Sequence, residues 1–253
     1  MRTVLTISAL GLKDYYRRKI FIITLLIMFV VAGTGLLANP FTLGFQSRLI
    51  RDIALLFIQL FTIFFALALG ATAIPNEIER KMIYPFLARP LTRGQYLWGK
   101  FLAIALLVIL NDLIFGAELI VMLAFSAREV HWMILPACLL ISLESLVVIA
   151  FALWFSTFAT PPVTFALMVL LYVVGNLSHI YTLTLTAGNS IMAFLLMHLK
   201  GLIPYFDYFS IRSAVTHDHP VTLAYFAMVF LYGALYIFVI MLLAEVSFLR
   251  KNL

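Results

Sequence analysis

Residues 76–84 read Asn-Glu-Ile-Glu-Arg-Lys-Met-Ile-Tyr, and this charged run interrupts a chain that is otherwise strongly apolar. Of the 253 residues, 64% are hydrophobic and 11% are charged, whereas soluble domains carry about 25% charged residues. Long apolar stretches precede and follow the run, so it lies between two candidate membrane helices. A charged helix in this position predicts a surface on which a soluble protein can bind.

Six apolar stretches are long enough to cross a bilayer, which takes about 20 residues per helix. They cover residues 20–38, 50–74, 97–125, 132–158, 162–183 and 221–247. Thr160-Pro161-Pro162 separates the fourth from the fifth, because two prolines prevent one helix from continuing. The sequence predicts an all-α integral membrane protein with a single transmembrane domain over residues 1–253. It leaves no room for a soluble catalytic domain.

The distribution of Lys and Arg predicts the orientation of these helices. With both termini in the cytoplasm, 12 of these residues fall on the cytoplasmic side and 5 on the other, as the positive-inside rule requires. We therefore expect a multi-pass protein of the cell inner (plasma) membrane with cytoplasmic N- and C-termini. Residues 1–19 carry apolar and basic side chains on separate helical faces, which favours an interfacial helix. A disordered basic tail is the alternative.

The cytoplasmic loop between the second and third spans carries helix start signals. Asn76 and Glu79 have the spacing of a capping box, which predicts a short helix within residues 76–88 that Pro85 ends. A second box, at Thr92 and Gln95, predicts the start of the third span.

Side chains just beyond this start have the pattern of a membrane interface. We expect Tyr96 and Trp98 at the interface and Lys100 extended to the lipid headgroups. On the other side of the membrane, residues 184–220 contain a stretch too short to span, followed by an aromatic cluster at 205–209. This pattern predicts an outer hairpin that is re-entrant or interfacial.

Two motifs that suggest ligand binding are weak here. Residues 94–100 match the first seven positions of a P-loop, but Phe101 replaces the hydroxyl that would bind magnesium, and no strand precedes the motif. We predict no nucleotide site. His217-Asp218-His219 offers only two imidazoles and one carboxylate, so we interpret these as solvated loop residues and predict no metal site.

Acidic residues inside the predicted spans are more informative, because carboxyl groups in a membrane are costly and usually face protein or water. Asp112 and Glu144 each lie about 12 residues into a span, near the bilayer midplane. Glu118 lies further along the third span, on the face that carries Asn111. These four residues are candidates for a polar or proton-linked pathway. Hydrogen bonding between helices is the alternative.

The segment from Ile74 to Lys100 resembles the permease subunits of ABC-2-type ABC transporters. That family has an acidic pair, a short amphipathic helix, a Leu-small-x-Pro-x-x-Arg turn and a Gly-Lys pair after its second span. The matching positions here are Glu77 and Glu79, the helix up to Tyr84, residues 87–93, and Gly99-Lys100. The six spans and the outer hairpin resemble the family as well. The most similar subgroup is the copper-enzyme-maturation-like permeases, although Arg80-Lys81 stands where many members have a small residue.

The resemblance implies that two permease subunits form a translocation pathway, with export as the expected direction. Separate ATPase subunits would bind ATP and magnesium, so that this chain is not an enzyme and holds no cofactor of its own. They would act through the coupling helix at 76–88. The residues expected to couple to them are Glu77, Glu79, Arg80, Lys81, Tyr84, Arg89 and Arg93. No nucleic-acid partner is expected.

Two other functions remain compatible with the residues alone. A polytopic membrane enzyme could use Asp112, Glu118 and Glu144 as acid–base groups, although no nucleophile or metal-ligand set accompanies them. A proton-coupled secondary transporter could use the same carboxyl groups to carry protons.

Overall fold

The computed structural model of the chain describes residues 46–79, 92–126, 131–176, 203–217 and 219–250. All regular structure within these residues is helical, which confirms the predicted all-α class. The predicted interfacial helix at 1–19 and the first span at 20–38 lie outside the described residues.

Eight helices follow one another along the described residues. They are α3 (Gln46–Ala73), α4 (Pro75–Glu79), α6 (Arg93–Ser126), α7 (Ile134–Ser156), α8 (Pro161–Asn176), the 3₁₀ helix η2 (Phe206–Phe209), α11 (Arg212–Thr216) and α12 (Leu223–Leu249).

Four segments in the described part of the chain are long and apolar enough to cross a membrane. They are Ile50–Glu79, Arg93–Ala124, Ile134–Ser156 and Leu223–Leu249, and they correspond to the predicted spans at 50–74, 97–125, 132–158 and 221–247. The shortest has 23 residues and is therefore about 35 Å long, enough for a hydrocarbon core of about 30 Å. The described helix of the predicted span at 162–183, α8, has 16 residues; residues 177–183 lie outside the described part.

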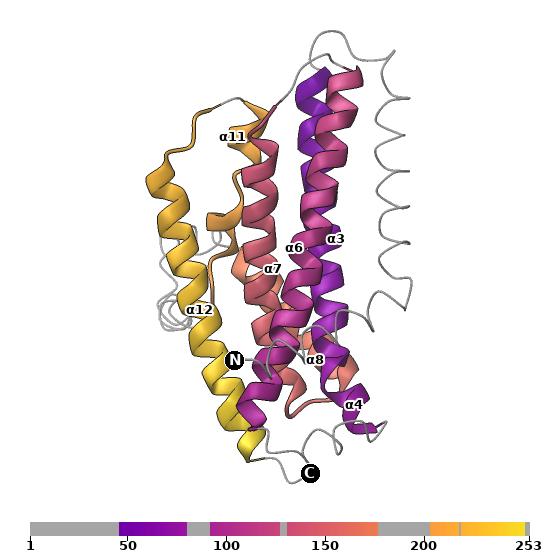
Figure 1. Ribbon diagram of the computed structural model, residues 1–253, viewed down its shortest axis with the longest axis vertical. Helices are drawn as coiled ribbons and strands as arrows, with labels where there is room; N and C mark the ends of the chain where they lie inside the picture. The colour runs from indigo at the N-terminus through magenta and orange to yellow at the C-terminus, as the bar shows by residue number, and fades with distance from the viewer. Residues whose placement is uncertain (1–45, 80–91, 127–130, 177–202, 218, 251–253) are drawn as a thin grey trace, which may run out of the picture.

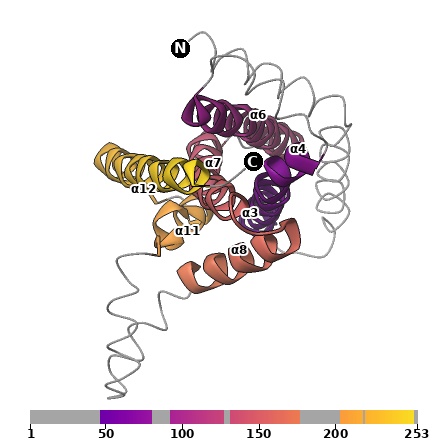
Figure 2. The ribbon, with the colours of Figure 1, turned by 90° about the horizontal axis from the view of Figure 1, so that it is seen from below.

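Helix α7 occupies the middle of the bundle, and α12 lies at its edge (Figures 1 and 2). In the most apolar segment of α7, 78% of the residues are buried inside the protein. The corresponding share in α12 is 22%. Helix α7 packs on α3, α6 and α12. The exposed apolar surface of α12 is suited to contact with lipid rather than water.

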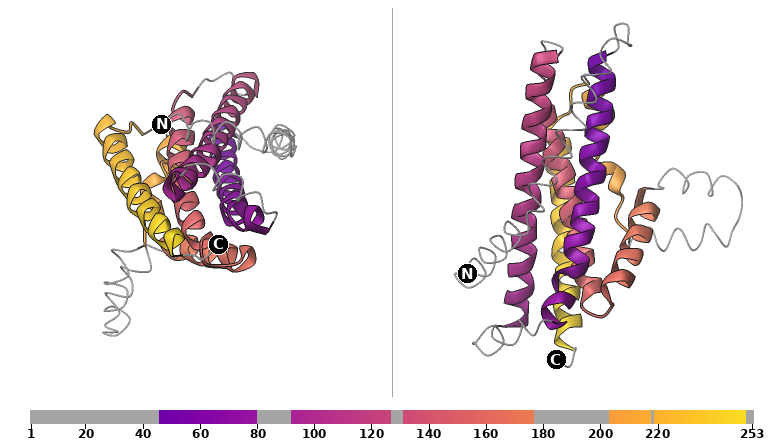
Figure 3. Two further views of the ribbon diagram at one scale, coloured as in Figure 1. Left: turned by 60° about the horizontal axis from the view of Figure 1, so that its bottom comes forward. Right: turned by 90° about the vertical axis from the view of Figure 1, so that its right-hand side faces the viewer.

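The ends of α4 and α12 and the start of α6 meet at one end of the bundle, the lower end in Figure 1 and the right-hand panel of Figure 3. From there α6 and α12 diverge, so that they are far apart at the upper end (Figures 1 and 2). The two helices thus form a V with α7 between its arms.

The described part of the predicted outer hairpin, residues 203–217 and 219–220, includes η2, which packs between helices. Phe206 and Phe209 are fully buried, and η2 contacts α7 and α8. The ring of Tyr172 in α8 lies 5.1 Å from that of Phe206. Gly175 permits this approach, because a Cβ atom there would overlap the Phe206 ring.

Candidate functional site

The charged run begins where α3 leads almost directly into α4 at the lower end. Ile74 alone separates the two helices, and its carbonyl accepts hydrogen bonds from the backbone N–H groups of Glu77 at 3.2 Å and Ile78 at 3.1 Å. Pro75 holds the first position of α4, where its missing N–H and fixed φ are tolerated. The predicted cap at Asn76 was therefore wrong. The last turn of α3 already aligns the backbone, so the helix starts one residue earlier.

Glu77 points back into the bundle and joins α4 to the start of α6. One carboxylate oxygen pairs with the ammonium group of Lys100, and the other accepts a hydrogen bond from the hydroxyl of Tyr96. The side chains of Lys100 and Glu77 are only 10% and 20% exposed. A charge-assisted arrangement of this kind is stronger than hydrogen bonds between neutral groups.

The positions of Tyr96 and Lys100 correct the sequence-based prediction. Neither side chain is exposed on the surface of the bundle, since Tyr96 is 2% exposed and Lys100 is buried. Both side chains turn inward because the Glu77 carboxylate supplies the partner that a buried ammonium group and a buried phenol require. Trp98, by contrast, is half-buried.

Glu79 differs from Glu77 in that its side chain is exposed at the end of α4. Two positions along an α-helix turn a side chain by about 200°, so the two carboxylates of the acidic pair point in nearly opposite directions. The charged run continues from this exposed end. Its other predicted contact residues, Arg80, Lys81, Tyr84 and Arg89, lie outside the described residues.

Helix α6 starts with the predicted capping box, which is confirmed. The hydroxyl oxygen of Thr92 accepts a hydrogen bond from the backbone N–H of Gln95 at 3.2 Å, and the Gln95 side-chain oxygen accepts one from the Thr92 N–H at 3.4 Å. The reciprocal bonds satisfy two backbone donors that the first turn leaves free. They fix the point at which the chain enters α6.

Arg93 joins the start of α6 to the end of α12. Its guanidinium donates to the carbonyl oxygens of Phe248 at 2.8 Å and Leu249 at 3.2 Å, and it lies 5.7 Å from the centre of the Phe248 ring. The last carbonyls of a helix lack partners within the helix and attract cations. Arg93 therefore acts as a cap on α12 from 155 residues away in the sequence.

Further contacts hold the same end of α12. The rings of Tyr96 and Phe248 stack with centroids 6.1 Å apart, and the indole N–H of Trp154 in α7 donates to the Ser247 hydroxyl at 3.0 Å. The carboxyl group of Glu245 lies against Gly94, at a place where a Cβ atom would overlap it. The lower end thus joins α4, α6, α7 and α12.

The structure places the two predicted midplane carboxyl groups between helices. Asp112 in α6 is completely buried and accepts hydrogen bonds from the hydroxyl groups of Thr62 in α3 and of Ser142 in α7, the latter at 2.8 Å. Its carboxyl group therefore joins three helices inside the apolar part of the bundle.

Glu144 in α7 has the same kind of environment. It is 0% exposed and accepts hydrogen bonds from the amide of Gln59 in α3 at 2.9 Å and from the hydroxyl of Tyr172 in α8 at 3.0 Å. Gln59 and Thr62 are three residues apart and so share one face of α3. This face brings Asp112 and Glu144 into one polar layer. Their hydrogen bonds join neighbouring helices, as the alternative of hydrogen bonding between helices predicted.

Asn111 and Glu118, the other two candidates for a polar pathway, do not join this layer through hydrogen bonds. Asn111 is buried, and among the described residues neither its side-chain oxygen nor Oε1 of Glu118 has a hydrogen-bond partner. The sequence placed these residues on one face of α6, but the structure places no described donor against either oxygen.

The structure shows a polar cluster at the upper end that the sequence analysis did not predict. Arg51 is completely buried and donates to Nδ1 of His131 at 2.7 Å and to the carbonyl oxygen of Thr216 at 3.3 Å. Next to it, Asp52 pairs with Arg212 at 3.1 Å. The adjacent charges at the start of the span predicted at 50–74 were the available signal. Their partners lie 80 to 165 residues away and could not be inferred.

The histidines do not form a metal site in the described part of the chain. No group of three or more His, Cys, Asp or Glu side chains is placed there to hold a metal ion. The rings of His217 and His219 lie 6.1 Å apart, while Asp218 lies outside the described residues. His131 is bound to Arg51.

The long apolar helices define a multi-pass membrane protein. The sequence matches the family described as ABC-2 family transporter protein over residues 5–253, and the chain belongs to this family. It is a transmembrane protein that fits the role of a transporter permease, and its family implies partnership with ABC ATPase subunits. No curated protein matches the chain. The family match does not distinguish subgroups, so the copper-enzyme-maturation-like subgroup stays a prediction.

Proposed function

We propose that this chain is the permease subunit of an ABC-2-type exporter, and that two permease subunits form the translocation pathway. Separate ABC ATPase subunits bind ATP and magnesium and drive the transport cycle. The chain crosses the inner (plasma) membrane of the cell six times. Both of its termini lie in the cytoplasm. In this orientation the lower end, with α4 and the start of α6, faces the ATPase subunits.

The observation that carries the proposal is the family match over residues 5–253, together with the division of the acidic pair at the lower end. Glu79 is exposed where the charged run begins, while Glu77 is held by Lys100 and Tyr96. A contact surface needs exposed groups on a rigid base. We assign the contact to Glu79, Arg80, Lys81, Tyr84 and Arg89, and the base to Glu77 and Arg93.

The polar layer at Asp112 and Glu144 supports a structural role within this proposal. Each carboxyl group receives two hydrogen bonds from neighbouring helices, and the donors on both are neutral side chains. These bonds hold the helices of the permease together, whereas an enzyme or proton carrier needs access from water to such groups.

A co-purification experiment tests the proposal. The chain is co-expressed with candidate ABC ATPase subunits from the same genome, and each ATPase carries the affinity tag. Combined Glu79→Ala, Arg80→Ala, Lys81→Ala and Tyr84→Ala substitutions are expected to reduce recovery of the permease at least tenfold without affecting membrane insertion. Arg48→Ala, at an exposed position at the opposite end of α3, is the matched control and should not reduce recovery.

Recovery of the four-residue variant at the wild-type level would contradict the assigned contact. Two further results would contradict the function itself. One is turnover of a substrate by the purified chain without any ATPase. The other is labelling of cysteines at positions 76–88 from the outside of intact cells.

A further inference from the structure

The contacts of α12 are distributed unevenly along its length. Its lower end is bound to α6 through Arg93 and to α7 through the Trp154–Ser247 hydrogen bond. Its upper end is exposed, with Leu223 82% accessible, and its polar contacts there go to the 205–208 segment, through Tyr225 to the carbonyl of Tyr208 at 2.7 Å.

Between these ends, α12 meets α7 at Gly233, which packs against Leu143. A Cβ atom at this position would lie 3.0 to 3.2 Å from side-chain atoms of Leu143, so the absence of a side chain lets the two helices meet. Above this contact, α12 separates from α7 and α6. The space between them is an apolar groove of about 440 Å³.

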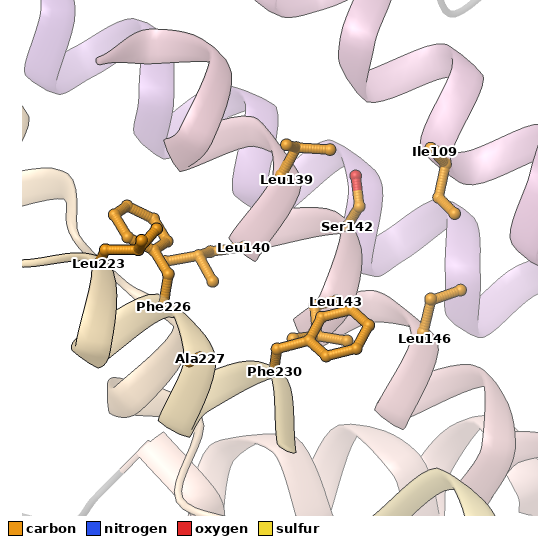
Figure 4. Close-up of a pocket in the computed structure, with 10 residues that line it drawn as sticks. All are labelled: Ile109, Leu139, Leu140, Ser142, Leu143, Leu146, Leu223, Phe226, Ala227 and Phe230. Carbon is orange, nitrogen blue, oxygen red and sulfur yellow. The ribbon is translucent and has the colours of Figure 1, made fainter. Parts of the chain in front are cut away.

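The groove lies inside the upper half of the V formed by α6 and α12. Phe226 and Phe230 of α12 form one wall, Leu139 and Leu143 of α7 the other, and Ile109 of α6 closes one side (Figure 4). Ser142 supplies the single side-chain oxygen among the residues drawn. Apolar walls have no directional bonds to break when they separate, so this part of the interface can change width at low cost.

We propose that α12 is a lever that turns about the Gly233–Leu143 contact, and that its lower end is moved by α4 through α6. The inference rests on the proposed function, in which ATPase subunits act on the exposed side of α4. Movement of α4 passes from Glu77 to Lys100 and Tyr96, along the first turns of α6, and from Arg93 to the last turn of α12. Lys100 and Arg93 are therefore positioning residues for transport.

The lengths of the two arms follow from the helix rise. From Gly233 to Phe248 the lower arm is about 22 Å, and from Gly233 to Leu223 the upper arm is about 15 Å, at about 1.5 Å per residue. A rigid lever moves its two ends in opposite directions. The upper end of α12 is thus displaced about two thirds as far as the lower end, which widens or narrows the apolar groove.

Spin-label distances in the complete transporter complex test the lever. Two label pairs bracket α7 and α12, one at Trp132 and Leu223 at the upper end and one at Phe158 and Val246 at the lower end, all four being exposed. The buried Cys138 is replaced by Ala. When ATP is trapped on the ATPase subunits, the two distances are expected to change in opposite directions, the upper change being the smaller.

Lys100→Met and Arg93→Met are each expected to abolish at least half of both changes while the ATPase still co-purifies with the permease. Lys100→Arg, which keeps a cation beside Glu77, should restore them, and Arg250→Met, at an exposed cation just beyond the end of α12, should leave them intact. A purely structural role predicts altered distances without nucleotide, followed by normal changes on trapping ATP, and that result would overturn the lever.

The other outcomes are also decisive. Changes in the same direction at both ends, or full changes in Lys100→Met and Arg93→Met, would overturn the lever while the ATPase association still supports the proposed function. Failure of the wild-type chain to associate with any ATPase would overturn the proposed function and the lever with it. If a Met variant does not fold, the exchange Glu77→Lys with Lys100→Glu tests the same link, and the lever requires that the exchange preserve the changes.

Discussion

Glu77 and Glu144 are the same kind of residue in one bundle, but they have different kinds of partner. Glu77, at the lower end, is 20% exposed and pairs with the cation of Lys100 as well as with a phenol. Glu144, in the middle of α7, is completely buried, and its donors among the described residues are an amide and a phenol. The kind of partner thus changes with the depth of the carboxyl group in the bundle. An ion pair is tolerated near the end, where water screens part of its charge, whereas neutral side chains donate the hydrogen bonds in the interior.

The two sites also differ in what they connect. Glu144 joins α3, α7 and α8, and Asp112 joins α3, α6 and α7. The lower end joins α4, α6 and α12 through Glu77 and Arg93. The interior layer thus links one group of helices, while the lower end links α12 through α6 to α4, the helix in which the charged run begins. Substitutions in the two regions should affect different properties of the protein.

The largest effect on stability is expected at the interior site. Glu144→Ala leaves the donors of Gln59 and Tyr172 without a partner and should reduce the free energy of unfolding by about 1–3 kcal/mol. Glu144→Gln keeps the size of the side chain and one acceptor oxygen, and is expected to cost less than half as much. Unfolding by SDS in mixed micelles measures both. Equal losses in the two variants would show that the hydrogen bonds are not what holds the helices.

A smaller effect is expected from the ion pair at the lower end. Glu77→Gln removes the charge that faces Lys100 but keeps one acceptor oxygen for a hydrogen bond, and it should reduce the free energy of unfolding by about 1 kcal/mol. A double-mutant cycle with Lys100→Met measures the coupling energy between the side chains of Glu77 and Lys100.

The salt dependence of that cycle sharpens the contrast with the interior. The coupling between Glu77 and Lys100 should fall when salt rises from about 0.05 M to 0.5 M, because screening lengths shorten to a few ångströms. The loss in Glu144→Ala should not change with salt. Identical salt dependence at the two sites would contradict the comparison.

The smallest effect is expected from Tyr96→Phe. The substitution removes one hydrogen bond to Glu77 but keeps the ring that stacks on Phe248, so the loss in unfolding free energy should be about 0.5–1 kcal/mol. Tyr96→Ala, which removes the stacking as well, is the control and should lose more. A Tyr96→Phe loss as large as that of Tyr96→Ala would mean that the hydroxyl rather than the ring stabilises this end.

Some features of the fold could be predicted because their cause is local. Apolar stretches of membrane length must form helices, since a backbone in lipid has to satisfy its own hydrogen bonds. The start of α6 at Thr92 could be predicted in the same way, because both partners of the capping box are three residues apart. The start of α4 was predicted one residue late. The last turn of α3, and not a capping side chain, orients the backbone of the first turn of α4.

The sequence by itself determined that this chain crosses a membrane several times and that a charged run separates two of its spans. It also marked the acidic pair of Glu77 and Glu79. Only the tertiary structure decided that Glu77 faces Lys100 while Glu79 is exposed, and that Arg93 caps a helix 155 residues away. Helix formation depends on neighbours along the chain, whereas the partner of a charged side chain depends on which helices pack together, and that is settled by the whole bundle.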